Sequence, residues 1–437
     1  MMNFYAKNNA NHIYIFLCIL LGVLISGCTP LIKAWPDTSS SEYSALKTSN
    51  LSKSIFVFFD GTGNDPETPT NVWRLYELIE NQKDPLTTGF YVEGVGANKG
   101  LAIRQVLGLG MEDRIKKGYS FITKNYKPGD KIYIFGFSRG ALEARSLAGL
   151  IAYSGIPRVS SDDINHLEKI ANSILEHTKD KNDSDYEKIW ESWNSGDPPL
   201  LADKIKSKLG FEVQGAEVTF LGIWDTVPGS FFLDYNICKE KKNRKDGDRY
   251  KTDSYPVIRN IVHAVSIDEK RSKFQPILAC PPINNKNATK INELWFPGAH
   301  ADVGGGYKNP DSNKYPNVSS NDLPNISLNW MIGMLHESYQ FKEGKPTYYL
   351  DKGKRVSLLP EKVDGLAHWS YGDFPGNLGS NCVDRKQQLE ELNDSTLKKL
   401  KILNHPSYED RLKLKHAPIE KGGKVEISEY PLVCPKD

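Results

Sequence analysis

The stretch KIYIFGFSRGALEARSLAGLIAY, residues 131–153, decides the fold. Residues 132–135 (IYIF) form a continuous apolar run that predicts a buried strand over 131–135, and residues 139–153 have a strongly helical pattern. Ser138 stands at the turn between them, with Gly136 and Gly140 on either side. A serine on a strained strand-to-helix turn needs such glycines, because the turn leaves no room for side chains beside it. The free N–H groups of the helix that follows would favour an oxyanion. The string therefore predicts a nucleophilic serine.

Other segments extend this unit into an alternation of strands and helices. Buried strands are predicted at residues 54–59, 218–224 and 293–296, and helices at 72–79, after a Thr70 cap, and at 111–126. Residues 260–269 (NIVHAVSIDE) also have a helical pattern. Strands that alternate with helices predict an α/β fold, with a mainly parallel sheet flanked by helices.

The chain ends predict three further parts around a catalytic domain at 51–345. Residues 13–25 are an uncharged apolar run of 13, too short to span a bilayer comfortably but suited to a signal peptide. This run leads into Ser26-Gly27-Cys28, so 1–27 is expected to be a lipoprotein signal peptide and Cys28 the acylated residue. Residues 28–50 are polar and serine-rich, as in a flexible tether. Residues 156–210 are expected to be a helical insertion, and 346–437 a C-terminal extension.

These features predict a protein anchored by acylated Cys28 to the bacterial cell envelope, at the outer membrane facing the periplasm. An uncleaved membrane anchor is the alternative interpretation. Of the six cysteines, four would remain free to form two disulfides, with three connectivities open. These are Cys238, Cys280, Cys382 and Cys434. The formal net charge of +2 does not indicate a nucleic-acid partner.

A nucleophilic serine needs a base, and the base needs a carboxylate that orients it. Asp225 follows the strand at 218–224, and His300 lies in a glycine-rich loop after the strand at 293–296. We prefer His300 to His263 as the base, because His263 falls in the helical pattern. Open parallel sheets bind their ligands at the carboxyl ends of the strands, where all these residues are expected.

The loop after residue 59 is expected to form part of an oxyanion hole. Backbone amides of Gly61 or Thr62 would act together with that of Arg139. Asp60 is expected to organise this loop by accepting amide hydrogen bonds.

Two other kinds of site were considered for the same residues. A phosphatase of the haloacid-dehalogenase class would need an aspartate where Phe58 stands, so that interpretation fails. A metal site from Asp60, Asp65, His300 and Asp302 would match no defined ligand spacing. No cofactor is therefore expected.

Seven strings together resemble the α/β-hydrolase domain family that includes type VI secretion phospholipase effectors. They run in family order over about residues 52–340: FFDGTGND (58–65), TNVWRL (70–75), YVEGVGAN (91–98), GFSRGA (136–141), GIWDTV (222–227), HAVSIDEKRSKFQP (263–276) and WFPGAHADVGGGY (295–307). The resemblance implies an α/β-hydrolase-like fold, Ser138, Asp225 and His300 as a catalytic triad, and hydrolysis of lipid esters. The predicted leader differs from delivered effectors and favours a resident envelope lipase or esterase as much as a toxin.

The sequence leaves several alternatives open. A lipoprotein that uses the hydrolase fold only to bind a partner is the non-enzymatic alternative. The ester that is cleaved and the oligomeric state are not determined by any of these patterns.

Overall fold

The computed structural model describes residues 40–43, 51–95, 110–179, 188–190, 197–228, 250, 252–279, 289–307 and 323–340, with short strand segments at 366–367, 403–404, 415–416, 419–421 and 424–426. The chain divides into two units, Met1–Asp37 and Thr38–Asp437, and every described residue belongs to the second. The predicted signal peptide, the predicted acylation site Cys28 and the four remaining cysteines lie outside the described residues. Within the described part, no helix is both long and apolar enough to cross a membrane.

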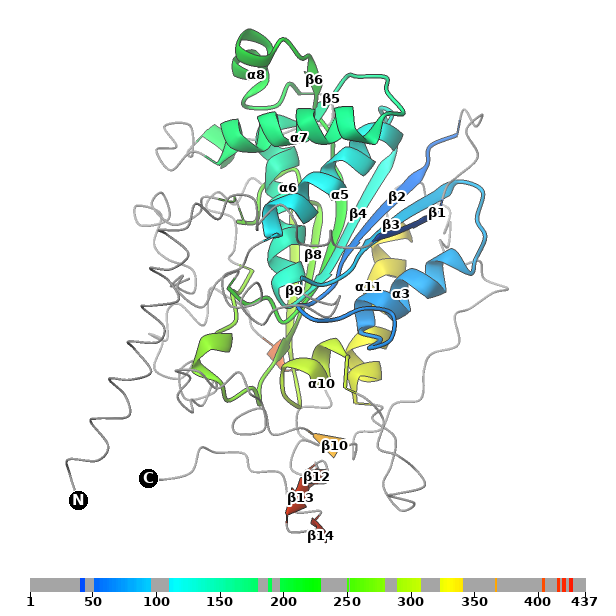
Figure 1. Ribbon diagram of the computed structural model, residues 1–437, viewed down its shortest axis with the longest axis vertical. Coiled ribbons are helices and arrows are strands. Elements are labelled where there is room, and N and C mark those ends of the chain that lie inside the picture. Colours follow the sequence, from blue (N-terminus) through cyan, green and yellow to red (C-terminus); the bar gives the residue numbers. More distant parts are fainter. Residues whose placement is uncertain are drawn as a thin grey trace, which may run out of the picture. The chain divides into compact units, whose positions relative to one another are not determined.

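An eight-stranded sheet forms the centre of the molecule, in the order β1-β3-β2-β4-β7-β8-β9-β11 (Figure 1). Its strands are β1 (Ser40–Tyr43), β2 (Ser54–Phe59), β3 (Thr87–Val92), β4 (Lys131–Phe137), β7 (Val218–Trp224), β8 (Asn260–Ser266), β9 (Lys290–Phe296) and β11 (Leu403–Asn404). Every neighbouring pair is parallel except β1 and β3. The predicted mainly parallel sheet is confirmed.

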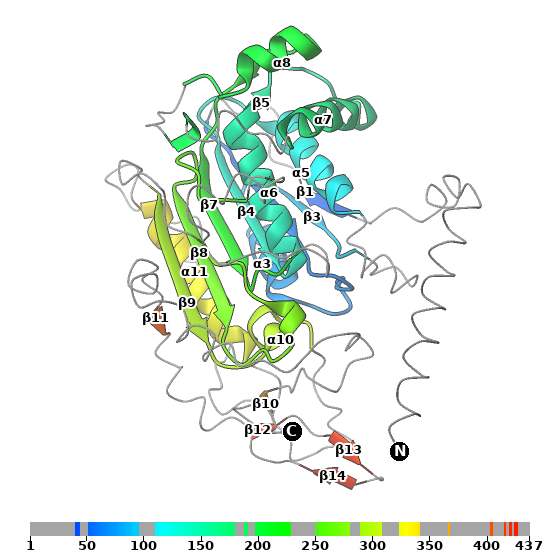
Figure 2. The ribbon, with the colours of Figure 1, turned by 90° about the vertical axis from the view of Figure 1, so that its left-hand side faces the viewer.

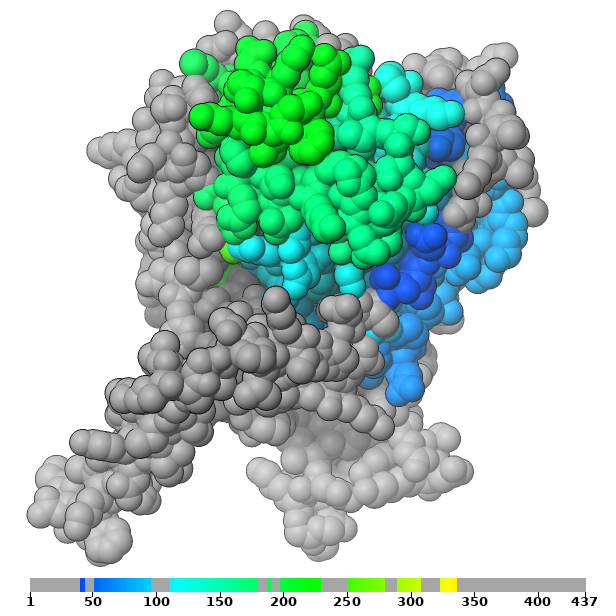
Figure 3. All heavy atoms as spheres, turned by 45° about the horizontal axis from the view of Figure 1, so that its top comes forward, coloured from blue at the N-terminus to red at the C-terminus, as the bar shows by residue number. Residues whose placement is uncertain are grey.

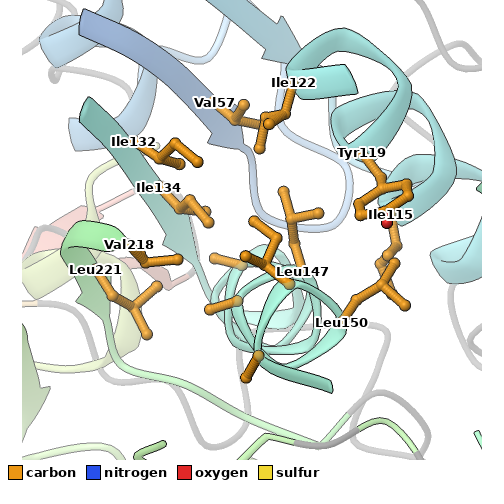
Figure 4. Close-up of a cluster of buried hydrophobic side chains, with 14 of the residues drawn as sticks. Val57, Ile115, Tyr119, Ile122, Ile132, Ile134, Leu147, Leu150, Val218 and Leu221 are labelled. Atoms are coloured by element: carbon orange, nitrogen blue, oxygen red, sulfur yellow. The ribbon is translucent and has the colours of Figure 1, made fainter. Parts of the chain in front are cut away.

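Helices cover both faces of this sheet, which explains why its central strands are apolar throughout. On one face lie α5 (Met111–Asn125) and α6 (Arg139–Ser154), and on the other α3 (Asn71–Glu80) and α11 (Pro324–Gln340). Strand β2 sends Ile55, Val57 and Phe59 to the first face and Phe56 and Phe58 to the second. Figure 4 shows the first of these two cores, where α5 and α6 pack against β2, β4 and β7.

The predicted helical insertion lies at the end of the sheet away from α10 (His300–Gly304), as Figures 1 and 2 show. It contains α7 (Ile164–Thr178), a 3-10 turn at Lys188–Trp190 and α8 (Ala202–Leu209). It begins with a short strand that the sequence did not indicate, β5 (Ile156–Pro157), which pairs antiparallel with β6 (Val213–Gln214) just after the insertion. Its residues form a continuous green surface in Figure 3. Helix α7 packs on α5 and α6, so it thickens the helical layer on that face.

Three segments differ from the sequence expectations. Residues 260–266 form strand β8 and not a helix. This strand is buried between β7 and β9, and a strand covered on both faces carries no alternation to distinguish it from a helix. Residues 40–43, within the predicted tether, form edge strand β1, where Tyr43 packs on the Tyr76 ring at 5.5 Å. Strand β3 was not predicted.

The predicted C-terminal extension also contributes to the sheet, through β11 beside β9. It contains two further strand pairs. These are β10 (Leu366–Ala367) with β12 (Lys415–His416), and β13 (Ile419–Lys421) with β14 (Lys424–Glu426).

The turn between β4 and α6 has no space for side chains at its glycines. A Cβ atom on Gly136 would lie 2.3 Å from the carbonyl oxygen of Gly140. A Cβ atom on Gly140 would lie 2.2 Å from the carbonyl oxygen of Phe59 at the end of β2. Both distances are far below van der Waals contact with backbone atoms that cannot move alone, so the first turn of α6 touches the sheet only because these residues are glycines.

Replacing Gly140 by alanine is therefore expected to destabilise the fold by about 2–3 kcal/mol, because the new methyl group overpacks against the backbone of β2. Gly333 is the matched control, since it also lies inside a helix but is exposed and a Cβ there meets nothing within 4 Å. Gly333→Ala should stabilise α11 by about 0.5–1 kcal/mol. Thermal melting measures both changes, and equal shifts in the two variants would contradict the packing explanation.

Candidate active site

Ser138 occupies the strained turn that the sequence predicts. It precedes α6 as the N-cap residue with φ 61° and ψ −126°, a backbone conformation that residues with side chains rarely adopt. Its N–H donates to the carbonyl oxygen of Trp224 at 3.0 Å, which ties the turn to the end of β7. The side chain is 6% exposed. The turn thus holds the hydroxyl group at the carboxyl edge of the sheet.

Asp225 and His300 meet Ser138 at this edge although they lie 75 residues apart in the chain. His300 Nε2 lies 2.8 Å from Ser138 Oγ, and His300 Nδ1 lies 2.6 Å from Asp225 Oδ2. Because an ionised carboxylate only accepts, Nδ1 carries the proton that is donated to Asp225 and Nε2 accepts from the serine hydroxyl. The structure therefore brings all three predicted residues into one hydrogen-bonded chain.

Backbone contacts hold the carboxylate of Asp225 in place. The residue follows β7 with φ 36°, and its N–H donates to the carbonyl oxygen of Ala264 on β8. Its second carboxylate oxygen, Oδ1, accepts the N–H of Ser266 at 3.0 Å. Asp225 thus has one oxygen fixed by the backbone, while the other orients His300.

Burial lowers the pKa of His300 below its ordinary value of 6.5, although the hydrogen bond and charge of Asp225 act in the opposite direction. A lowered pKa keeps the imidazole neutral at neutral pH. A neutral imidazole is the form that can accept a proton from serine, so this environment suits a general base.

Asp60 organises the loop that follows β2, as the sequence predicts. Its buried carboxylate accepts hydrogen bonds from Gly61 N (2.7 Å), Thr70 Oγ1 (2.8 Å) and Tyr91 Oη (2.6 Å). Burial raises its pKa from 3.8 to about 6, against the effect of these donors.

This arrangement corrects the prediction for Gly61 as an oxyanion donor, because the N–H of Gly61 is already donated to Asp60. Thr62 is the next residue of the loop. Its hydroxyl oxygen is buried and, among the described residues, has no hydrogen-bond partner. Arg139 begins α6, and burial lowers the pKa of its half-buried side chain to about 10. The amides of Thr62 and Arg139 thus remain from the predicted set.

A buried ion pair joins this loop to α5 and α6. Arg114 Nη1 donates to Glu143 Oε1 at 2.8 Å, and Nη2 donates to the carbonyl oxygen of Asp60 at 2.8 Å. Burial also raises the pKa of Glu143, to about 7. Arg114 thus fixes the first residue of the loop relative to the helix that carries Ser138.

His263 makes a second, fully buried pair with a carboxylate. Its Nδ1 lies 2.8 Å from Glu293 Oε2, and its Nε2 accepts the N–H of Thr226 at 3.1 Å. Both ring nitrogens are therefore used within the protein, and the preference for His300 over His263 agrees with this geometry. The reason given for that preference was wrong, since His263 lies on a strand.

The sequence pattern of the segment after β8 indicates no chemical role, but this segment contacts His300 in the structure. Phe274 lies against the ring of His300 at 5.1 Å between ring centroids, and Arg271 lies over Phe274. Both belong to the string HAVSIDEKRSKFQP, which carried the resemblance but no chemical assignment. Among the described residues, no group of three or more His, Cys, Asp or Glu side chains is arranged to hold a metal ion.

The fold, together with the residues at the carboxyl edge of the sheet, defines the structural class of the protein. A mainly parallel sheet with helices on both faces, and a strained serine opening the helix after β4, form the α/β-hydrolase fold. A sequence model of the T6SS phospholipase effector Tle1-like catalytic domain matches residues 53–334, nearly two thirds of the chain. The chain belongs to this family, and residues 53–334 match its catalytic domain.

Individual relatives are more distant. An uncharacterized protein of Saccharomyces cerevisiae is 27% identical over 260 residues, which make up 53% of this chain and 33% of the yeast protein. A crystal structure of an uncharacterized protein from Pseudomonas aeruginosa has 19% identity and a TM-score of 0.37, covering 68% of this chain and 46% of that one. The Tle1 effector bound to the VgrG spike of the Type 6 secretion system has 16% identity and a TM-score of 0.35, covering 78% and 81%. The chain thus spans about a third of the yeast relative and less than half of the Pseudomonas protein.

The raised pKa of Asp60 predicts how Asp60→Asn changes the pH dependence of stability. Because the folded pKa is about 6 and the ordinary value is 3.8, protonated Asp60 contributes stability that is present below pH 3.8 and lost as the pH rises through about 6. An asparagine does not titrate. The melting temperature of Asp60→Asn minus that of the wild type should therefore rise between pH 4 and pH 7. A difference that stays constant over this range would contradict the buried, destabilised carboxylate.

Proposed function

We propose that the protein is a serine esterase that cleaves carboxylic ester bonds of phospholipids at the cell envelope, with Ser138 as nucleophile, His300 as base and Asp225 as the orienting acid. The observation that carries this proposal is the hydrogen-bonded chain from Ser138 Oγ through His300 to Asp225, with heavy-atom distances of 2.8 and 2.6 Å. Membership of a phospholipase family supports a lipid ester as the substrate.

The chemistry follows from the proton positions in that chain. Ser138 Oγ attacks the ester carbonyl carbon while its proton passes to His300 Nε2, and the imidazolium is stabilised by Asp225. The imidazolium then gives the proton to the departing alcohol, which leaves an acyl group on Ser138. A water molecule repeats the sequence, with its proton taken by His300, and releases the fatty acid and the free serine.

The negative charge on the tetrahedral oxygen needs donors that are already in place. We assign this role to the backbone N–H groups of Thr62 and Arg139. Arg139 opens α6, where helix N–H groups lack partners within the helix. Thr62 lies in the loop whose neighbours Phe59 and Asp60 contact Gly140 through their carbonyl oxygens. The loop and the helix start are thus in direct backbone contact, as a shared oxyanion site requires.

The envelope location rests on the N-terminal sequence. An apolar run of 13 residues ends just before Ser26-Gly27-Cys28, in the pattern of a lipoprotein signal. We propose that acylated Cys28 anchors the protein to the outer membrane on its periplasmic side. An anchor there would keep the catalytic domain within reach of phospholipid.

Labelling with a fluorophosphonate probe tests the nucleophile in the full-length protein. Ser138→Ala should abolish labelling and, like Asp225→Asn, lower ester hydrolysis by about four orders of magnitude. Ser146→Ala is the matched control, because Ser146 lies in the same helix with its hydroxyl bonded to the carbonyl oxygen of Leu142. It should label like the wild type. Equal labelling of Ser138→Ala and wild type would overturn the mechanism and favour a binding role for the fold.

The same variants distinguish the substrate class. Vesicles of phosphatidylethanolamine and phosphatidylglycerol should release fatty acid with the wild type and not with Ser138→Ala. Hydrolysis of short p-nitrophenyl esters alone would keep the serine esterase and reject the phospholipid substrate.

Metabolic labelling with a palmitate analogue tests the anchor. Cys28→Ser should lose the label and leave the membrane fraction, because the lipid is attached to that thiol. Cys18→Ser is the control, since Cys18 lies within the apolar run and would be removed with the signal peptide. It should keep both the label and the membrane association. Membrane association of Cys28→Ser equal to that of the wild type would instead favour an uncleaved anchor.

A further inference from the structure

Two aromatic rings lie against the imidazole of His300, one from the end of β4 and one from the segment that follows β8. The Phe274 ring meets His300 edge to face, with 5.1 Å between centroids and an interplanar angle of 76°. The Phe137 ring lies on His300 with 4.6 Å between centroids and an angle of 32°. Two aromatic side chains from different elements, the end of β4 and the turn Ser272–Phe274, therefore limit the rotation of the histidine ring.

Arg271 holds Phe274 in this position. The guanidinium carbon lies 3.5 Å from the centroid of the Phe274 ring, close enough for a cation–π contact. Its Nε and Nη2 donate to the two carboxylate oxygens of Glu269, each at 2.9 Å. This bidentate pair fixes the plane of the guanidinium, which an ammonium group cannot do.

Glu269 connects this group back to His300. Its Oε2, which accepts from Arg271, also accepts the backbone N–H of His300 at 3.3 Å. Both residues are nearly excluded from solvent, with Glu269 0% and Arg271 8% exposed. The three side chains and the histidine therefore form a closed ring of contacts at the carboxyl edge of the sheet.

We propose that Arg271, Glu269 and Phe274 form a clamp that fixes the His300 ring between Ser138 and Asp225 and balances the charge around it. They are positioning residues that act through His300. The inference rests on the proposed function in that it takes His300 to be the base.

Three charged groups act on the His300 imidazole from the elements packed against it. Asp225 at the end of β7 and Glu269 raise its pKa, and Arg271 lowers it. Burial acts to lower the pKa of Arg271, but its acidic neighbours, Glu269 first among them, raise it further. The net effect is a raised pKa, so the guanidinium stays charged. Arg271 and Glu269 therefore act on His300 with opposite signs, and that opposition provides a specific test.

The charge arm of the test measures the titration of His300 by NMR in the full-length protein with 13C-labelled histidine, the signal being identified by its loss in His300→Gln. Arg271→Gln should raise the titration midpoint and Glu269→Gln should lower it. Lys273→Gln is the matched control, since it removes an exposed positive charge from the same turn and should leave the midpoint unchanged. General loosening would expose His300 and raise the midpoint in both variants. Midpoints that move in the same direction, or not at all, would overturn the clamp.

The positioning arm uses variants that keep the charge or remove only the ring. Arg271→Lys keeps the positive charge but loses the planar contact with Phe274, and Phe274→Leu removes the ring edge. Each should lower kcat for a p-nitrophenyl ester by on the order of tenfold, with little change in KM, because the misplaced ring affects the proton transfer. Phe274→Tyr keeps the ring and should retain most of kcat. Wild-type kcat in Arg271→Lys and Phe274→Leu would reject positioning by the clamp.

The two arms separate this inference from the proposed function. The NMR titration needs no turnover, so it decides the clamp even if the protein hydrolyses none of the esters. Conversely, loss of activity in Ser138→Ala with unchanged His300 midpoints in the clamp variants would retain the esterase and reject the clamp.

Discussion

The contact between the first turn of α6 and the end of β2 is the constraint on which the site depends. Gly140 brings the helix so close that a single Cβ atom would lie 2.2 Å from the carbonyl oxygen of Phe59. This approach forces Ser138 into its positive φ and sets the loop 60–62 beside the helix start. The strain at Ser138 costs about 1–3 kcal/mol and persists only because the surrounding sheet and helix fix the turn. Packing therefore determines where the hydroxyl group lies before any catalytic partner is considered.

A buried ion pair fixes how the loop and the helix start are oriented relative to each other. Arg114 bonds both Glu143 on α6 and the carbonyl oxygen of Asp60, so the helix and the loop are joined through one guanidinium. Such pairs add little net stability, because removing the ions from water costs several kcal/mol per ion. Their value here is geometric, since a buried guanidinium with fixed partners allows one arrangement of loop and helix. Burial raises the pKa values of Asp60 and Glu143 although Arg114 acts to lower both, because the low-polarity surroundings disfavour the charged carboxylates.

The sequence predicted the parts of this structure that depend on local pattern. The strand–serine–helix unit, the Thr70 cap and helix α5 follow from residues close together in the chain, and all three are confirmed as structure. Asp225 and His300 were each selected by the residues next to them, at the end of a predicted strand. Local pattern failed where burial on two faces removed the alternation, as in β8, and where an edge strand had polar composition, as in β1. It also could not show that Gly61 donates to Asp60, or that Phe274 lies against His300 with Arg271 over the Phe274 ring. Those contacts depend on side-chain directions and on loops that meet only in the folded chain.

Two buried histidine–carboxylate pairs show why residue type alone does not define a base. His263 with Glu293 and His300 with Asp225 have the same Nδ1-to-carboxylate hydrogen bond, at 2.8 and 2.6 Å. The difference lies at Nε2. In His263 that nitrogen already accepts the backbone N–H of Thr226, so its lone pair is not available to a hydroxyl group. In His300 it faces a hydroxyl group, which can give up its proton to it. His300 follows the end of β9 and lies beside Ser138 at the carboxyl edge of the sheet, whereas His263 lies within β8, and this difference in position makes only one of them suited to proton transfer.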